Sequence, residues 1–264
     1  MAKMSTRRKL AIATWSAPRE GNIYGKLTLD ATNVLAYLAK IRETTGEKVT
    51  ITHVVGRAVA MALGKAPGLN GRIVWGRFEG FPSVNVTYLV ALKEGADLAK
   101  ATVEDADKKG VTQIAQELRA LASSLHGGED ADFEKTKGLL RALPTWLIRP
   151  LLFVTGWLAS ALGVSIPALG VRPFPFGSCV VTSVGMLGLD EGYAPPTPFA
   201  RVPLYVLVGA MTDQPAVVAG ELAIRPLLTL SATIDHRFID GFQGAILAKE
   251  IRRVFETPAL LDEL

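Results

Sequence analysis

The residues best suited to chemistry lie in one stretch, 229–241, which reads TLSATIDHRFIDG. Its first half is β-branched and apolar, which predicts a strand that ends at Asp235. His236 would then stand at the end of the strand, with Asp240 four residues further on. An imidazole titrates near pH 6.5, so a histidine held there can act as a general base toward a thiol. A hydrogen-bonded structural histidine is the alternative that spacing alone leaves open.

Asp240 also has two readings. It can orient His236 directly, or it can pair with an arginine and hold the turn in shape. The four-residue offset places the carboxylate beside the turn, so the sequence favours the second role. The remaining candidates are less suited to a catalytic role. Cys179, the only cysteine, is predicted to be a core thiol. His53 and His126 are predicted to be structural or solvated.

Hydrophobic periodicity predicts the elements that must position these residues. Alternating or β-branched runs indicate strands at 23–29, 73–78, 84–92, 99–103, 179–184, 204–211 and 227–234, with a hairpin within 216–224. Apolar residues at helical spacing indicate helices at 3–14, 32–44, 52–65, 111–125 and 241–255. This order predicts an α/β fold of two layers, in which helices pack on a mixed sheet.

The middle of the chain interrupts this rhythm. Residues 135–189 contain no Asp or Glu but five basic residues, and residues 150–170 carry no charge at all. We expect a helical excursion packed on the domain or on a neighbouring subunit. Peripheral contact with an anionic membrane through residues 145–170 is a second reading, and a true span is a third. Gly156, Gly163 and Pro167 break the segment, which argues against a span.

Composition limits the class of protein. The chain has 264 residues, of which 49% are hydrophobic and 20% charged, and its net charge is +4. This balance predicts a globular domain with a substantial core, and the absence of a dense basic stripe argues against a nucleic-acid partner. No Cys/His cluster has metal-ligand spacing, so we expect no metal. One cysteine and no evident signal peptide predict a cytoplasmic protein.

Several segments together resemble a known family. DHRFIDG is similar to the DHRxxDG signature of the catalytic core of 2-oxo acid dehydrogenase E2 subunits, which are dihydrolipoamide acyltransferases with a chloramphenicol acetyltransferase-like fold. RRKLA near the start resembles the basic opening of that core, and CVVTSVGMLG resembles the strand that the family writes as FTISNLG. The resemblance covers most of the chain outside about residues 130–176. We therefore expect one acyltransferase-like domain, 1–264, with an apolar insertion at about 130–176.

The resemblance implies a thiol acyl transfer. His236 would take the proton from the thiol of coenzyme A or of a dihydrolipoyl group. Thr182 matches the family's hydroxyl that stabilises the tetrahedral oxyanion, so the implied catalytic residues are His236, Thr182 and Asp240. Asp240 matches the acid that stabilises the catalytic loop through an N-terminal arginine, for which Arg7 or Arg8 is the candidate. Coenzyme A or acyl-CoA is the implied substrate.

The expected substrate-contacting residues are Ser183, Arg237 and Gly241. Ser183 would fall on the opposite face of the strand from Thr182 if that strand is regular. In this fold the active site lies between subunits, so a homotrimer or a larger trimer-based assembly is implied. The chain shows no lipoyl domain, so we expect any lipoyl group to come from another protein in trans. The alternatives are a non-catalytic trimeric scaffold or membrane-anchoring protein, and a chloramphenicol-type small-molecule acetyltransferase.

Overall fold

The protein is built on a six-stranded mixed sheet with the order β1-β8-β7-β6-β4-β5. The computed structural model describes residues 21–92, 97–126, 140, 142–239 and 241–263. Neighbours run antiparallel at β1–β8, β8–β7 and β4–β5, and parallel at β7–β6 and β6–β4. The strands are β1 (Asn22–Asp30), β4 (Val86–Leu92), β5 (Asp97–Val103), β6 (Cys179–Ser183), β7 (Leu204–Val218) and β8 (Glu221–Asp235).

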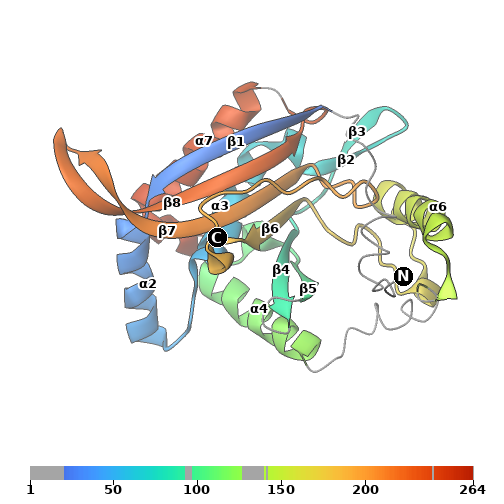
Figure 1. The fold of residues 1–264 in the computed structure, drawn as a ribbon, viewed down its shortest axis with the longest axis horizontal. Coiled ribbons are helices and arrows are strands. Elements are labelled where there is room, and N and C mark those ends of the chain that lie inside the picture. Colours follow the sequence, from blue (N-terminus) through green and yellow to red (C-terminus); the bar gives the residue numbers. More distant parts are fainter. Residues whose placement is uncertain (1–20, 93–96, 127–139, 141, 240, 264) are drawn as a thin grey trace, which may run out of the picture.

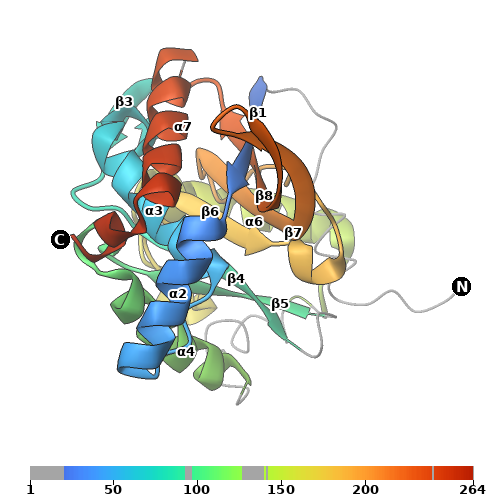
Figure 2. The same ribbon diagram turned by 90° about the vertical axis from the view of Figure 1, so that its left-hand side faces the viewer.

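Four helices cover one face of this sheet (Figures 1 and 2). Val34, Val59 and Ile114 from three of these helices are buried against Val181 and Leu228 from the sheet, in one large hydrophobic core. The strands and helices predicted from the sequence therefore pack in the expected two-layer arrangement. These helices are α2 (Thr32–Thr45), α3 (Ile51–Lys65), α4 (Val111–His126) and α7 (Gly241–Glu256).

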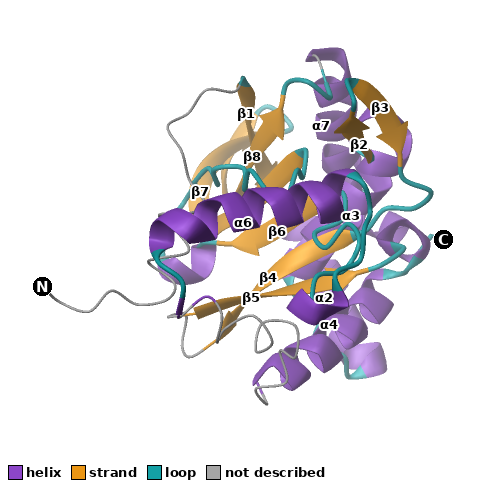
Figure 3. Ribbon diagram, turned by 90° about the vertical axis from the view of Figure 1, so that its right-hand side faces the viewer, coloured by secondary structure: helices purple, strands orange, loops and turns teal. Residues whose placement is uncertain are grey.

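The opposite face of the sheet carries a smaller apolar cluster and lies nearer to α6 (Thr145–Gly156) (Figure 3). A five-residue π-helix, η4 (Trp157–Ala161), continues directly from α6. The far halves of β7 and β8 form a hairpin that projects from the sheet at the other end of the molecule's longest axis from α6 (Figure 1). Among the described residues, no helix combines the length and the apolar character needed to cross a membrane.

The prediction of one strand at 73–78 is wrong. The chain instead forms a small hairpin, β2 (Gly71–Val74) with β3 (Arg77–Gly80). Trp75 and Gly76 form its turn with φ of 52° and 73°, the two positive values that a type I′ hairpin turn requires. The predicted strand at 204–211 and the predicted hairpin within 216–224 belong to the same long β7–β8 pair. The predicted helix at 3–14 lies outside the described residues.

Short helices complete the chain and link these elements. The η1 turn precedes β2, η3 follows β5, and η7 closes the chain after α7. Arg57 on α3 is almost fully buried and donates hydrogen bonds to backbone carbonyls of Ala106 and Asp107 at 3.2 and 2.8 Å, which ties η3 to the core. The short helices are η1 (Pro67–Leu69), η3 (Ala106–Lys108), η5 (Pro167–Leu169), η6 (Gly185–Leu187) and η7 (Pro258–Asp262).

Candidate active site at the end of β8

His236 directly follows the last residue of β8, as the sequence predicts. Its backbone N–H donates to the carbonyl of Gly21 at 3.2 Å, and the N–H of Asp235 donates to the carbonyl of Pro203 at 2.9 Å. The strand end is therefore tied on both sides, to the segment before β1 and to the segment before β7. The side chain of His236 is exposed, so its ring can reach a ligand.

The ring of His236 is oriented by a backbone carbonyl. Its Nδ1 lies 2.7 Å from the carbonyl oxygen of Ile239. A carbonyl oxygen can only accept, so Nδ1 carries the proton and Nε2 of the neutral ring keeps the lone pair. This tautomer leaves Nε2 as the basic atom of an accessible imidazole, which is the arrangement a general base needs.

Asp235 and Arg237 brace the turn from both sides of His236. The Arg237 guanidinium Nε donates to the two carboxylate oxygens of Asp235 at 2.9 and 3.0 Å, and the Arg237 backbone N–H donates to the same carboxylate at 3.0 Å. Asp235 is buried, so these charge-assisted bonds also compensate its lost hydration. The predicted substrate-contacting role of Arg237 stays a prediction, but within one chain its guanidinium engages Asp235.

An aromatic contact joins the histidine turn to the β2–β3 hairpin. The rings of Phe238 and Phe78 meet edge to face, with centroids 6.2 Å apart. A Cβ built on Gly68 in η1 would lie 3.6 Å from the carbonyl oxygen of Phe238, so η1 also lies against this turn. The hairpin that the sequence prediction missed is therefore part of the wall beside His236.

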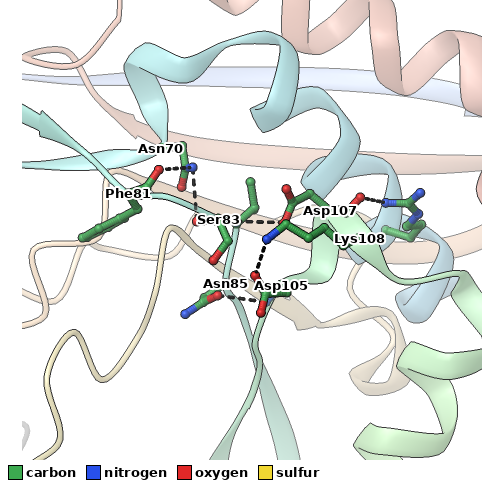
Figure 4. Close-up of polar contacts among 9 residues, drawn as sticks. Asn70, Phe81, Ser83, Asn85, Asp105, Asp107 and Lys108 are labelled. Carbon is green, nitrogen blue, oxygen red and sulfur yellow. Dashed lines mark hydrogen bonds and ion pairs between the residues drawn. The ribbon is translucent and has the colours of Figure 1, made fainter. Parts of the chain in front are cut away.

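A buried amide fixes the base of that hairpin (Figure 4). The side-chain amide of Asn70 donates to the carbonyls of Phe81 and Ser83 at 3.3 and 3.2 Å, and its oxygen accepts from the hydroxyl of Ser178. Next to it, the N–H of Val84 donates to Asp107 at 3.0 Å. These bonds join the segments that lead into β2, β4 and β6, so they set the hairpin's position relative to the sheet.

The same region is closed by a second set of polar contacts. The carboxylate of Asp105 forms an ion pair with Lys108 at 2.9 Å (Figure 4). The backbone N–H of Asp105 donates to the side-chain oxygen of Asn85 at 3.0 Å. The bond to Asn85 holds the turn after β5 next to the residue that precedes β4. The network is structural support for the site's wall and places no further reactive group beside His236.

Thr182 and Ser183 fall on opposite faces of β6, as predicted. Thr182 shares its face with Val180, which packs in the smaller cluster away from the helices. Ser183 shares its face with Cys179 and Val181, which belong to the large core under the helices. Both hydroxyl residues are half-buried. Thr182 is therefore the one of the two that faces away from the helix layer.

Within one chain, Thr182 and His236 are not neighbours. The register pairs Thr182 with Leu207, and Leu207 with Ser231, so Thr182 is level with Ser231 across the sheet. His236 comes five residues after Ser231, which is about 16 Å along a strand at about 3.3 Å per residue. The two proposed catalytic groups can meet only if they belong to different copies of the chain.

The other predicted site residues have different outcomes. Asp240, Arg7 and Arg8 lie outside the described residues, so their roles remain predictions. Gly241 begins α7, and a Cβ built on it would meet no atom within 4 Å. Cys179 is fully buried, and burial raises the pKa of its thiol well above the usual range, which fits the predicted core thiol.

Two parts of the site escaped prediction. The Ile239 carbonyl is a backbone group, and every residue carries one, so the sequence holds no signal for it. The Asp235–Arg237 brace could have been recognised, because an acid and an arginine two residues apart can meet across a turn. Among the described residues, no group of three or more His, Cys, Asp or Glu side chains could hold a metal ion.

The chain is similar in sequence and in structure to known acetyltransferases. The acetyltransferase component of the pyruvate dehydrogenase complex of Bacillus subtilis is 25% identical over 236 residues, which cover 88% of this chain and 44% of that protein. The chain thus spans less than half the length of this relative. A probable dihydrolipoamide acetyltransferase of Listeria monocytogenes has a similar structure, with a TM-score of 0.69 and 18% identity over 97% of this chain and 94% of that one.

The fold extends to a more distant enzyme. A chloramphenicol acetyltransferase superposes with a TM-score of 0.52 and 12% identity over 96% of each chain, which shows a shared fold. The sequence model of 2-oxoacid dehydrogenases acyltransferase (catalytic domain) matches residues 5–138 and 172–262. The unmatched residues between these two segments, 139–171, contain α6 and η4. Because the two matched segments make up most of the chain, it belongs to the family of 2-oxoacid dehydrogenase acyltransferase catalytic domains.

Proposed function

We propose that this chain is an acyltransferase that moves an acyl group between coenzyme A and a thiol acceptor of the dihydrolipoyl type, with His236 as general base. The observation that carries the proposal is the bond between His236 Nδ1 and the Ile239 carbonyl at 2.7 Å. It selects the tautomer whose exposed Nε2 can accept a thiol proton. Membership of the acyltransferase family supports the same chemistry.

The transfer proceeds in two steps. Nε2 takes the proton of the acceptor thiol, and the resulting thiolate attacks the carbonyl carbon of the acyl-CoA thioester. The tetrahedral intermediate then collapses, the bond to the coenzyme A sulfur breaks, and the imidazolium returns its proton to the departing thiolate. The same ring nitrogen therefore acts as the base in the first step and, once protonated, as the acid in the second.

The oxyanion of the intermediate needs a donor. We assign this role to the hydroxyl of Thr182 from a neighbouring copy, because the register holds Thr182 far from His236 of its own chain. This assignment makes the active unit a homo-oligomer, for which we propose a trimer. Ser183, Arg237 and Gly241 remain the proposed substrate contacts.

The acceptor is proposed to be a lipoyl group carried by another protein. The Bacillus subtilis relative is the acetyltransferase component of a pyruvate dehydrogenase complex, and its name specifies a dihydrolipoyllysine residue as acceptor. Because that relative is a component of a multienzyme complex, we propose that this chain meets a lipoyl-bearing protein within such a complex.

The test is acyl transfer from acetyl-CoA to dihydrolipoamide, with the acylated product measured by chromatography. His236→Ala should reduce kcat by about 10²- to 10⁴-fold, the usual contribution of a general base. His236→Asn is the matched variant, because its amide nitrogen can keep the bond to the Ile239 carbonyl but offers no base. It should lose activity equally while its unfolding temperature stays close to the wild type.

The outcomes separate the proposed classes of protein. His236-dependent transfer to dihydrolipoamide supports the thiol transferase. Transfer only to an amine or hydroxyl acceptor would favour a chloramphenicol-type enzyme. If neither acetyl-CoA nor a panel of longer and acidic acyl-CoAs gives transfer that depends on His236, the acyltransferase proposal fails and a scaffold role replaces it.

A further inference from the structure

Helix α6 has two apolar faces, and only one of them packs against the rest of the domain. Ile148 is fully buried and packs with Leu140, Leu143 and Leu152. At the end of the helix, a Cβ on Gly156 would lie 2.5 Å from the Cβ of Phe199, so the backbone is pressed closely against the loop before β7. The inner face thus fixes the helix to the domain.

The outer face of α6 is apolar as well. Trp146, Phe153 and Trp157 are separated by seven and four residues, so they form one stripe along the helix. Leu147 and Val154, seven residues apart, form a second stripe beside it. Apart from Trp157, which is half-buried, these side chains are exposed. A helix that packed only on its own domain would carry polar residues there.

The stripe continues onto the β2–β3 hairpin. The rings of Trp75 and Trp157 meet edge to face with centroids 5.6 Å apart, and Trp75 is 78% exposed. At the other end of the stripe Trp146 is 75% exposed. We call this continuous surface the apolar ridge, which consists of Trp75, Trp146, Leu147, Phe153, Val154 and Trp157.

Basic side chains outnumber acidic ones around the ridge. Arg149 is exposed on α6, with its guanidinium 5.8 Å from the centre of the Phe153 ring, and Arg77 is exposed beside the hairpin turn. Glu79 on the same hairpin is paired with Arg72 at 2.6 Å. In sequence, residues 135–189 contain no acid. The ridge therefore complements an apolar surface that carries negative charge.

We propose that the apolar ridge docks the protein onto an anionic lipid bilayer, with α6 lying in the plane of the headgroups. The helix has 12 residues, about 18 Å at 1.5 Å per residue, which suits an in-plane position. Tryptophan at both ends with arginine alongside is the pattern of interfacial helices, whose indoles and guanidinium groups favour the headgroup layer. The ridge borders the hairpin that contacts the His236 turn, so docking holds the active-site wall near the membrane.

The test is co-sedimentation of the full chain with vesicles of equal parts phosphatidylglycerol and phosphatidylcholine. The ridge variant is Trp146→Ser with Phe153→Ser, and the charge variant is Arg149→Gln. The matched control is Leu222→Ser with Ile224→Ser, since both residues are 77% exposed on the β7–β8 hairpin at the far end of the molecule. Circular dichroism and thermal unfolding check that every variant is folded.

We expect the wild type to bind these vesicles, to bind pure phosphatidylcholine far more weakly, and to lose binding as salt is raised. The ridge variant should lose at least about tenfold in partition coefficient, which is about 1.4 kcal/mol. Arg149→Gln should lose several-fold, and the hairpin control should match the wild type.

Three results would overturn the proposal: no vesicle binding by the wild type, equal loss in the hairpin control, or full binding by the ridge variant. Sedimentation velocity of the same variants gives a further one. If the ridge substitutions dissociate a wild-type oligomer, the ridge is a contact between copies of the chain and not a lipid-binding surface.

Discussion

Two histidines of the described chain use the same ring atom in opposite ways. His236 Nδ1 meets a carbonyl and carries a proton, whereas His53 Nδ1 accepts the backbone N–H of Thr50 at 3.1 Å and is unprotonated. His53 occupies the third position of α3, where this bond completes a capping box. One histidine is therefore held as an accessible base, and the other is held neutral as part of a helix cap.

The helix-cap histidine predicts how stability depends on pH. Burial, and secondarily the charge of Arg119, lowers the pKa of His53 from 6.5 to about 4. The unfolded chain therefore binds a proton at higher pH than the folded chain does. Above pH 6.5, His53 should not lower the free energy of unfolding. As the pH drops from 6.5 to 4, this free energy should fall by up to about 3 kcal/mol, because the unfolded chain gains a proton that the folded chain does not.

The measurement is urea unfolding across this pH range for the wild type and His53→Gln. Glutamine at this position can still accept the Thr50 N–H through its side-chain oxygen but does not titrate. The variant should lose that part of the pH dependence while remaining folded at pH 7. Parallel curves for the two proteins would show that His53 is not the titrating group.

At the scale of elements, the end of β6, which carries Thr182, is held where the segment after it packs closely against β7. The β7 strand has a bulge between Val208 and Met211, and the segment after β6 packs against it. The N–H of Val184 donates to the carbonyl of Val208 at 2.9 Å, and that of Ala210 donates to the carbonyl of Leu189 at 2.8 Å. The bulge thus supplies the bonds that anchor the segment directly after Thr182.

Gly209 makes this crossing possible, and its substitution is a direct test. A Cβ at Gly209 would lie 1.9 Å from the carbonyl oxygen of Asp190, a backbone atom that cannot turn aside. Gly209→Ala should reduce the free energy of unfolding by about 1–3 kcal/mol. It should also lower transfer activity, because the loop after Thr182 must shift.

Gly25→Ala is the matched control for that substitution. Gly25 is also a strand glycine of the same sheet, and its Cβ would meet only the Cβ of Ala232, at 4.0 Å. Alanine there should be neutral or stabilise the protein by up to about 1 kcal/mol. Chemical denaturation of both variants measures the difference, and equal unfolding free energies would contradict the proposed crowding at Gly209.

The elements also show which features were predictable from sequence. The strand that leads to His236 could be predicted, because β-branched alternation indicates a half-buried strand directly. The β2–β3 hairpin could not, because Ile73, Val74, Trp75 and Phe78 read as one apolar run and only Gly76 marks the turn. The Ile239 carbonyl and the Asn70 contacts depend on tertiary packing, which brings together groups that lie far apart in sequence or belong to the backbone.

At the scale of the whole molecule, the sheet register has a direct consequence for assembly. Thr182 lies on β6, whereas His236 follows the end of β8, which is two positions away in the sheet and at a different height along it. If both residues serve one reaction, each active site must combine His236 of one copy with Thr182 of the next.

A shared site predicts that two inactive variants restore activity when their subunits mix. His236→Asn removes the base and keeps the hydroxyl, whereas Thr182→Val removes the hydroxyl and keeps the base. Each variant alone should have low activity. A site is complete when one copy supplies His236 and its neighbour supplies Thr182. In a cyclic trimer that contains both variants, this holds for one site of the three, which gives about one third of wild-type activity.

Subunits are mixed by co-expression with two different affinity tags, and doubly tagged oligomers are purified before the transfer assay. A mixture of separately purified variants that have not exchanged subunits is the control, and it should stay inactive. Activity in the control, or none in doubly tagged oligomers that are intact by size, would contradict a site built between copies. Recovery near one third in the doubly tagged trimers would assign the two residues to different subunits, since a site within one chain cannot be repaired by its neighbour.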